Sequence, residues 1–259
     1  MKAASARGST SVGVATVALL CVAWYALTTL TGTISGGRFP APFEVWQAAK
    51  QITVQGYADA RLHEHVLHSC KLVLLGFAAA VAVGVPLGLV MGWSRRAEAL
   101  LNPAFLLLRP IPPLAWIPLA IVWLGLGDAA KVLIIWLAAF VPSVINSYAG
   151  VRGVDTTLLE AARTLGIRRF MLVREVLLPG AAPMIFTGLR LSLQACWTTL
   201  VAGELIGAIA GLGHVLYQSS LDIFPAMILV GMIAVALTGG AMTKALEWFE
   251  HRAMPWRRA

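Results

Sequence analysis

Long apolar runs alternate with short polar segments along this chain of 259 residues. An apolar helix of about 20 residues is long enough to cross a hydrocarbon layer ~30 Å thick. One strongly polar stretch, Glu160 to Gly180, interrupts the pattern, and we expect it to be a helical element that docks onto a soluble protein. We predict an all-α membrane protein with about six transmembrane helices, near residues 12–33, 68–92, 99–123, 130–149, 181–206 and 223–244.

Composition and the positions of the basic residues add an orientation to this pattern. Hydrophobic residues make up 59% of the chain and charged residues only 12%, whereas soluble domains carry roughly 25% charged residues. With the N-terminus inside, the outer segments carry few basic residues, namely Arg38, Lys50, Arg61 and Lys131. The inner segments carry many more, namely Lys2, Arg7, Arg95, Arg96, Arg152, Arg163, Arg168, Arg169, Arg174, Lys244, Arg252, Arg257 and Arg258. Because basic residues favour cytoplasmic loops, we predict a multi-pass protein of the bacterial cytoplasmic (inner) membrane with both termini in the cytoplasm.

The first apolar run follows Lys2 and Arg7, a pattern that resembles a signal peptide. No clear small-x-small cleavage site comes after it, so we predict that it is the first transmembrane helix. The external segment that follows contains FPAPFEVWQAAKQI, which predicts a short amphipathic helix at the interface with Trp46 as its anchor.

Three parts are expected along the chain. Residues 1–61 would hold the N-terminal tail, the first transmembrane helix and the interfacial segment. Residues 62–246 would form the membrane domain, and residues 247–259 a basic cytoplasmic tail.

Neither the cysteines nor the histidines form a metal-binding pattern. The three cysteines lie far apart in apolar segments, as is typical of small buried side chains. His63, His65 and His68 lie close together, but no Cys or Asp nearby completes a site. We prefer to interpret the histidines as a polar lead-in to the second span, and we expect no metal.

Small residues recur at every fourth position of the second span, at Gly76, Ala80, Gly84, Gly88 and Gly92. Such a stripe lets two helices approach closely in lipid. It is compatible with a helix that glides during gating, but we prefer static packing.

Prolines interrupt the third span, since each removes a backbone donor and cannot continue a regular helix. They are Pro110, Pro112, Pro113 and Pro118. A break at membrane depth must be buried in protein or line a wet cavity. Arg109 adjoins the break, and either a functional role or capping of the freed carbonyls would explain a charge there.

Nearly all the polar groups of the fifth span share one helical face, and the rest of the helix is apolar. They are Thr187, Arg190, Gln194, Trp197 and Thr198. We expect this stripe to line a translocation path in which Arg190, with Gln194 and Thr198, favours an anion, and Arg109 is a second candidate. A polar packing face is the alternative. Glu204 follows near the outer end and is expected to sit at a gate or to pair with a loop.

Motifs for catalysis are absent from the sequence. It contains no phosphate-binding loop, no H-E-x-x-H and no nucleophile elbow, so we expect no enzyme activity and no bound cofactor. A polar pathway without catalytic groups favours transport. Three hypotheses remain: an importer driven by a separate ATPase, an ion-coupled transporter that uses Arg190 and Glu204, and a membrane enzyme or scaffold with histidine ligands.

The polar stretch predicts a short helix, a turn and a second short helix, the second from Ile167 to about Val173. Thr157 and Glu160 match a capping box, with Asp155 as the alternative cap. Gly166 is expected to end the first helix in a left-handed conformation. Further along, we expect Leu178, Pro179, Gly180 and Pro183 to turn the chain back into the membrane. An apolar strip with small residues at its centre would admit a close partner, at Leu158, Ala161, Ala162 and Leu165.

At this point the sequence resembles a known family. Glu160-Ala161-Ala162, then Gly166, then Val176-x-Leu178-Pro179 is similar to the EAA loop of type I binding-protein-dependent ABC importer permeases, and departs from it only in having Val176 for Ile. LRPIPPLAWIPLAIVWLGLGDAAKVLII, AGVRGVD and LVAGELIGAIAGLG resemble permeases for taurine, aliphatic sulfonates and nitrate. Together these blocks cover most of the chain from about residue 62 onward.

The resemblance implies the type I importer fold, with a cytoplasmic coupling helix and two copies of a partner ATPase that binds ATP and Mg. It further implies a second permease copy, in a homodimer, and a periplasmic or lipid-anchored solute-binding protein. The implied substrate is a small anion or zwitterion, taurine or an aliphatic sulfonate first and nitrate second; no nucleic acid is involved. Carried over onto this sequence, the coupling residues are Glu160, Ala161, Ala162, Leu165, Gly166 and Pro179.

Overall fold

The structure is a computed structural model, and it describes residues 15–16, 18–30, 39–205 and 210–258. Within these ranges the chain is helical, with loops between the helices and no named strand. The elements, with η for π- and 3-10 helices, are η1 (Ala26–Leu30), α2 (Pro42–Val54), α3 (Leu62–Trp93), α4 (Arg95–Leu108), η2 (Pro113–Trp116), α5 (Ile117–Leu124), α6 (Asp128–Arg152), α7 (Thr156–Thr164), α8 (Arg169–Met171), η3 (Leu172–Leu177), α9 (Leu178–Glu204), α10 (Leu212–Leu221), α11 (Pro225–Ala253) and η4 (Pro255–Arg258).

Four helices of the described part are long and apolar enough to cross a membrane. They coincide with the second, fourth, fifth and sixth predicted spans, and they are Leu62–Trp93, Asp128–Arg152, Arg169–Glu204 and Pro225–Ala253. A fifth crossing is present if α4 and Pro113–Leu124, bent by 80°, are counted as one span. Part of the first predicted span, 12–33, lies outside the described residues; Ala18–Thr29 within it is a shorter apolar helix.

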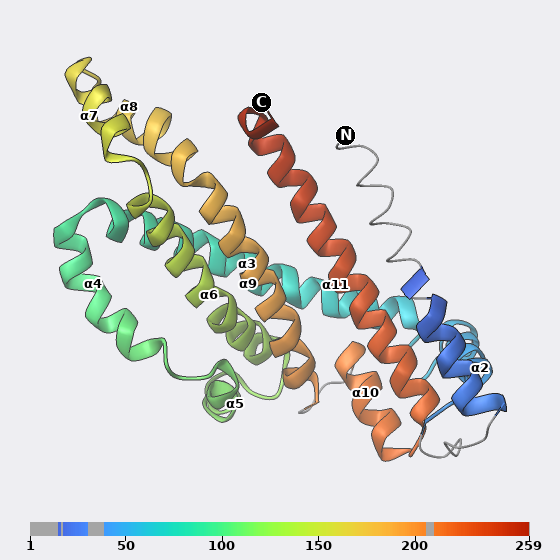
Figure 1. Cartoon of the computed structure of the whole chain (residues 1–259). Helices are drawn as coiled ribbons and strands as arrows, with labels where there is room; N and C mark the ends of the chain where they lie inside the picture. Colours follow the sequence, from blue (N-terminus) through green and yellow to red (C-terminus); the bar gives the residue numbers. More distant parts are fainter. Residues whose placement is uncertain (1–14, 17, 31–38, 206–209, 259) are drawn as a thin grey trace.

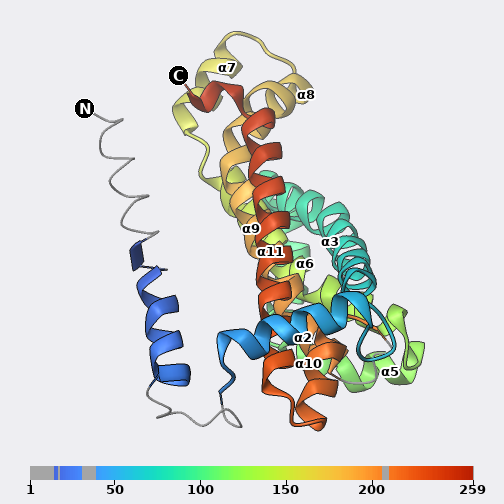
Figure 2. The same ribbon diagram turned by 90° about the vertical axis from the view of Figure 1, so that its right-hand side faces the viewer.

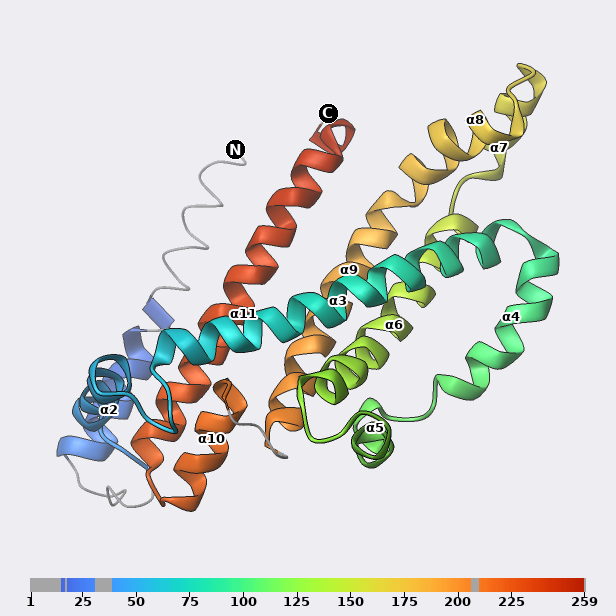
Figure 3. The same cartoon turned by 180° about the vertical axis from the view of Figure 1, so that it is seen from behind.

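The bend between α4 and α5 lies where the prolines predicted a break. Helix α4 ends at Leu108, and the chain becomes helical again in η2, which begins at Pro113. The third predicted span is therefore divided into two differently oriented helices, as Figure 3 shows.

Helices α3, α6 and α9 pack together as the core of the molecule (Figure 1). The glycine stripe of α3 is the surface that meets α6. A Cβ added to Gly76 would lie 2.5 Å from the side chain of Ile135, and one added to Gly88 would lie 2.5 Å from the carbonyl oxygen of Val144. The prediction of close helix approach is confirmed, and α6 is the neighbour that the sequence did not identify.

Replacing Gly88 with alanine should destabilise the fold, because the added methyl group collides with backbone that cannot rotate away. We expect a loss of about 1–3 kcal/mol, as for other overpacked sites. Gly240 in α11 is the matched control, since a Cβ there meets nothing within 4 Å, and Gly240→Ala should be neutral or stabilising by about 1 kcal/mol. Thermal unfolding in detergent measures the stability of both variants. Equal unfolding midpoints for Gly88→Ala and Gly240→Ala would contradict the close contact between α3 and α6.

The long helices have two distinct ends, which we call the α7 end and the α10 end. Helices α7 and α8 and the C-terminus lie at the first, whereas α2, α5 and α10 lie at the second (Figure 2). At the α10 end α2 lies across the long helices, and its buried Ile52 packs in one apolar cluster with Met227 and Val230 of α11. The short amphipathic helix predicted in this segment is therefore present.

Candidate functional site

Helix α7 is fixed at both ends by local hydrogen bonds. The Asp155 carboxylate accepts a hydrogen bond from the N–H of Thr157 at 2.8 Å. At the other end Gly166 has φ of +71° and donates its N–H to the carbonyl of Arg163 at 3.0 Å. The left-handed stop predicted at Gly166 is thus confirmed.

The capping box predicted at Thr157 and Glu160 is wrong. Helix α7 begins one residue before Thr157, so that residue lies inside the first turn, and Asp155 is the cap. An aspartate side chain is short enough to reach an N–H two residues further on, which satisfies one of the orphan donors of the helix. The Glu160 carboxylate is left exposed on the surface.

The α7 elbow, which we define as Asp155–Met171, projects at the α7 end of the molecule (Figure 1). Ala162 is buried, whereas Glu160, Ala161 and Gly166 are exposed. Leu165 is 79% exposed. Other large apolar side chains of the elbow are also exposed, namely Leu158, Phe170 and Met171. Exposed apolar side chains gathered at one place make the elbow a candidate surface for a partner.

Beyond the elbow the chain does not turn at Pro179 as predicted, nor does a separate short helix end near Val173. Instead α8, η3 and α9 run on as one helical segment, Arg169–Glu204. A proline inside a helical segment removes one backbone donor, and irregular turns such as a π-helical turn are where a helix accommodates this. Pro179 is half-buried in the first turn of α9, directly after the π-helical η3. The elbow is thereby joined rigidly to α9.

The predicted polar stripe of α9 divides into two flanks. Thr187, Gln194 and Thr198 are exposed. Arg190 and Trp197 lie on the flank toward α11, where Arg190 forms an ion pair with the buried Glu250 and the Trp197 ring lies 3.6 Å from the Cβ position of Gly239. Within the described part of the chain, Arg190 Nε and Trp197 Nε1 have no hydrogen-bond partner.

Arg109 lies at a cavity of about 320 Å³ between the α4–α5 bend, α6 and α9. No ion pair or side-chain hydrogen bond of Arg109 is present within the described part of the chain. Thr198 also lines the cavity, which therefore brings together two of the predicted path residues, Arg109 and Thr198. Its walls are mostly apolar, with Leu137 and Val141 from α6.

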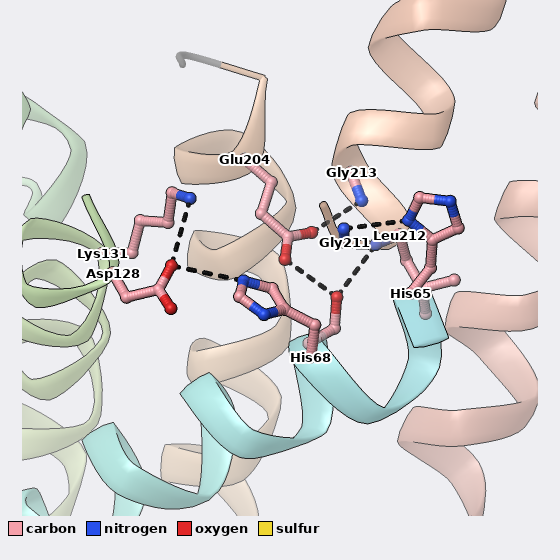
Figure 4. Close-up of polar contacts among 9 residues, drawn as sticks. His65, His68, Asp128, Lys131, Glu204, Gly211, Leu212 and Gly213 are labelled. Atoms are coloured by element: carbon pink, nitrogen blue, oxygen red, sulfur yellow. Dashed lines mark hydrogen bonds and ion pairs between the residues drawn. The ribbon is translucent and has the colours of Figure 1, made fainter. Parts of the chain in front are cut away.

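Glu204 is fully buried and ties three helices together at the α10 end (Figure 4). Its carboxylate accepts hydrogen bonds from the Ser69 hydroxyl at 2.8 Å and from the N–H of Gly213 at 2.7 Å. Gly211 has φ of +130°, and a Cβ there would lie 2.1 Å from the carboxylate. The sequence predicted a gate or a loop contact for Glu204; its partners are instead Ser69 of α3 and Gly213 in the first turn of α10.

His65 extends this network. The N–H of Gly211 donates to His65 Nδ1 at 3.0 Å, so the proton is on Nε2, which donates to the carbonyl of Tyr57 at 2.9 Å. Tyr57 in turn donates to the carboxylate of Asp222 at 2.5 Å. Burial, together with this carboxylate, raises the pKa of Tyr57. His65 therefore links the start of α10 to the segment between α2 and α3.

His68 lies apart from His65 and contacts Asp128, which also pairs with Lys131 at 3.5 Å (Figure 4). Among the described residues no group of three or more His, Cys, Asp or Glu side chains could hold a metal ion. The α10 end is thus stabilised by hydrogen bonds and ion pairs between elements.

Taken together, the apolar helices, the projecting elbow and the cavity define a membrane transport permease. Residues 84–254 match the family described as "Binding-protein-dependent transport system inner membrane component". The chain belongs to this family, the permease subunits of ABC importers, and it is not an enzyme. Membership implies an ATPase and a solute-binding protein as partners.

Named relatives cover nearly the whole chain. The taurine transport system permease protein TauC of Escherichia coli is 36% identical, over 95% of this chain and 90% of its own length. The putative aliphatic sulfonates transport permease protein SsuC of Bacillus subtilis is 33% identical, over 88% and 81%. The nitrate import permease protein NrtB of Synechocystis is 29% identical, over 92% and 87%.

A solved structure supports the fold. A crystal structure of an amino acid ABC transporter with histidines matches with a TM-score of 0.60 and 21% identity, covering 74% of this chain and 93% of that one. The predicted fold class, an all-helical membrane protein similar to ABC importer permeases, is confirmed.

The partners of several site residues do not follow from any pattern in the sequence. The sequence predicts a tail over residues 247–259, but Glu250 is buried against Arg190 because α11 continues to Ala253. Ser69 carried no motif, although it contacts Glu204. A carboxylate in a helix that is otherwise apolar was the available signal for Glu250.

Proposed function

We propose that this chain is the permease of an importer for a small organic anion of the taurine and aliphatic sulfonate class. The observation that carries the proposal is the 36% identity with TauC over 95% of the chain. Similarity to SsuC and NrtB supports an anionic substrate, since sulfonates and nitrate share a negative charge. Nitrate is the alternative substrate.

The α7 elbow is our candidate for the surface that docks onto the ATPase. It is exposed and carries apolar side chains among its charged ones, and it continues as one helical segment into α9, whose polar stripe runs toward the α10 end. A push on the elbow would therefore move the residues of the path. The ATP and Mg used in this step belong to the ATPase, since the sequence has no phosphate-binding loop.

The docking proposal also assigns an orientation. The α7 end faces the cytoplasm, together with both termini, and the α10 end faces the solute-binding protein. The positive-inside distribution of Lys and Arg supports this orientation, in the cytoplasmic (inner) membrane. Two ATPase copies would then serve two permease copies in a homodimer. A second copy would cover the part of the exposed polar face of α9 that does not border the cavity, at Thr187 and Gln194.

Sulfur-limited growth tests the substrate class. Cells without their own sulfonate importer, supplied with this permease, its ATPase and its binding protein, should grow on taurine or an alkanesulfonate as sole sulfur source. The same cells without the binding protein should not grow. Growth on nitrate as sole nitrogen source, with no growth on any sulfonate, would contradict the sulfonate assignment.

A further inference from the structure

We propose that Arg109, and not Arg190, is the anion-recognising residue of a substrate site within the permease, and that this site takes an alkanesulfonate in preference to taurine. The proposal rests on the proposed function and deepens it. It assigns a ligand chemistry to the cavity between the α4–α5 bend, α6 and α9.

The two arginines differ in how their charge is compensated. Arg190 is held by the carboxylate of Glu250, whose side chain is 5% exposed, so that its charge is neutralised within the protein. The guanidinium of Arg109 has no carboxylate, hydroxyl or carbonyl partner within the described part of the chain. Arg109 is exposed where it borders the cavity, so its uncompensated charge is open to a ligand or to water. Arg109 is therefore the better-placed group for an incoming anion.

The shape and chemistry of the cavity suit a short organic anion. Its volume of about 320 Å³ lies at the lower end of the range for ligand pockets, ~300–1,000 Å³. A guanidinium can donate two parallel hydrogen bonds to sulfonate oxygens, as it does to carboxylate and phosphate. Thr198 and Thr199 add hydroxyl groups on the α9 side. A polar head would thus bind at Arg109 and the threonines.

The apolar part of the lining favours a substrate that carries an alkyl group. Leu108, Leu137, Ala138, Val141 and Ala195 present apolar atoms to the cavity. Nitrate has no alkyl group that could contact these apolar atoms. Taurine carries an ammonium group, and the lining residues of this chain include no Asp or Glu to pair with it. An ammonium group buried without a partner is strongly unfavourable, so the site favours an uncharged alkyl chain.

The position of the cavity fits an early step in transport. Helix α5 and the bend before it lie toward the α10 end, opposite the α7 elbow (Figures 1 and 3). In the proposed orientation this is the side that receives substrate from the binding protein. Arg109 would therefore meet the anion before the coupling step at the elbow acts on α9.

Uptake by the reconstituted importer tests Arg109. With permease, ATPase and binding protein in liposomes, Arg109→Gln should lower ATP-driven uptake of butanesulfonate about tenfold or more, and Arg109→Lys should lower it less. Arg96→Gln is the matched control, because Arg96 is an exposed arginine at the other end of α4, and it should leave uptake unchanged. Copurification of the ATPase shows whether a variant assembles. If Arg109→Gln does not assemble, Thr198→Val is tested instead. We expect Thr198→Val to lower uptake several-fold.

Ligand binding to the permease–ATPase complex without the binding protein tests the preference. Labelled butanesulfonate should bind, taurine should compete at least about tenfold more weakly, and Arg109→Gln should remove binding. Wild-type uptake of butanesulfonate that persists unchanged in assembled Arg109→Gln would overturn the role of Arg109. Equal competition by taurine would overturn the preference. A wild-type importer that takes up no sulfonate at all would instead contradict the proposed function.

Discussion

A valine at Gly166 should abolish ATP-driven uptake while the protein still inserts into the membrane. Gly166 has φ of +71°, and a Cβ added there meets nothing within 4 Å. The conflict is therefore with the residue's own backbone, because β-branched residues strongly disfavour the left-handed region, at a cost of roughly 1–2 kcal/mol or more. Unwinding the end of α7 would relieve this backbone strain with the least loss of other contacts. It would also displace Ala161 and Leu165 from the proposed docking surface.

Asparagine is the matched control at this position, since it tolerates the left-handed conformation. Gly166→Asn should keep most of the uptake, whereas Gly166→Val should lose ATPase copurification or hydrolyse ATP without transport. The amount of protein in the membrane fraction should be equal for both variants. Wild-type uptake by Gly166→Val would show that the conformation of the elbow is not needed for coupling.

The features predicted correctly are those encoded locally in the sequence. Membrane helices follow from the length of apolar runs, and the end of α7 follows from a single glycine that takes a conformation other residues avoid. The stripe of small residues on α3 likewise predicted a close contact from spacing alone. In each case the physical cause lies within a single helix.

The partners across the molecule could not be predicted in this way. Arg190 and Glu250 are 60 residues apart, and Ser69 and Glu204 are 135 apart. Helical periodicity shows which residues share a face, but it does not show which helix that face meets. The course of the chain at Pro179 could not be predicted for a different reason: a proline can end a helix or lie within one at an irregular turn, and the surrounding fold decides which.

Removing the charge of Arg190 should destabilise the folded protein strongly. Glu250, the partner of Arg190, is 4% exposed, so Arg190→Gln leaves a buried carboxylate without its arginine. Breaking a buried ion pair costs ~3–5 kcal/mol, and we expect about 3 kcal/mol here, because the Arg190 side chain is 40% exposed. The double variant Arg190→Gln/Glu250→Gln should recover most of this loss. Thermal unfolding of both variants in detergent gives the two values.

The more exposed pair of Arg152 and Glu98, with side chains 42% and 25% exposed, is the control, and Arg152→Gln should cost about 1 kcal/mol or less. Uptake then separates the two roles of Arg190. If the double variant is stable and transports at the wild-type rate, Arg190 serves to hold α9 against α11. If it is stable but inactive, and Arg190→Lys retains uptake, the positive charge itself belongs to the path. Normal uptake in both Arg190→Gln and Arg190→Lys at normal expression would remove Arg190 from the path and leave Arg109 as its anion-recognising arginine.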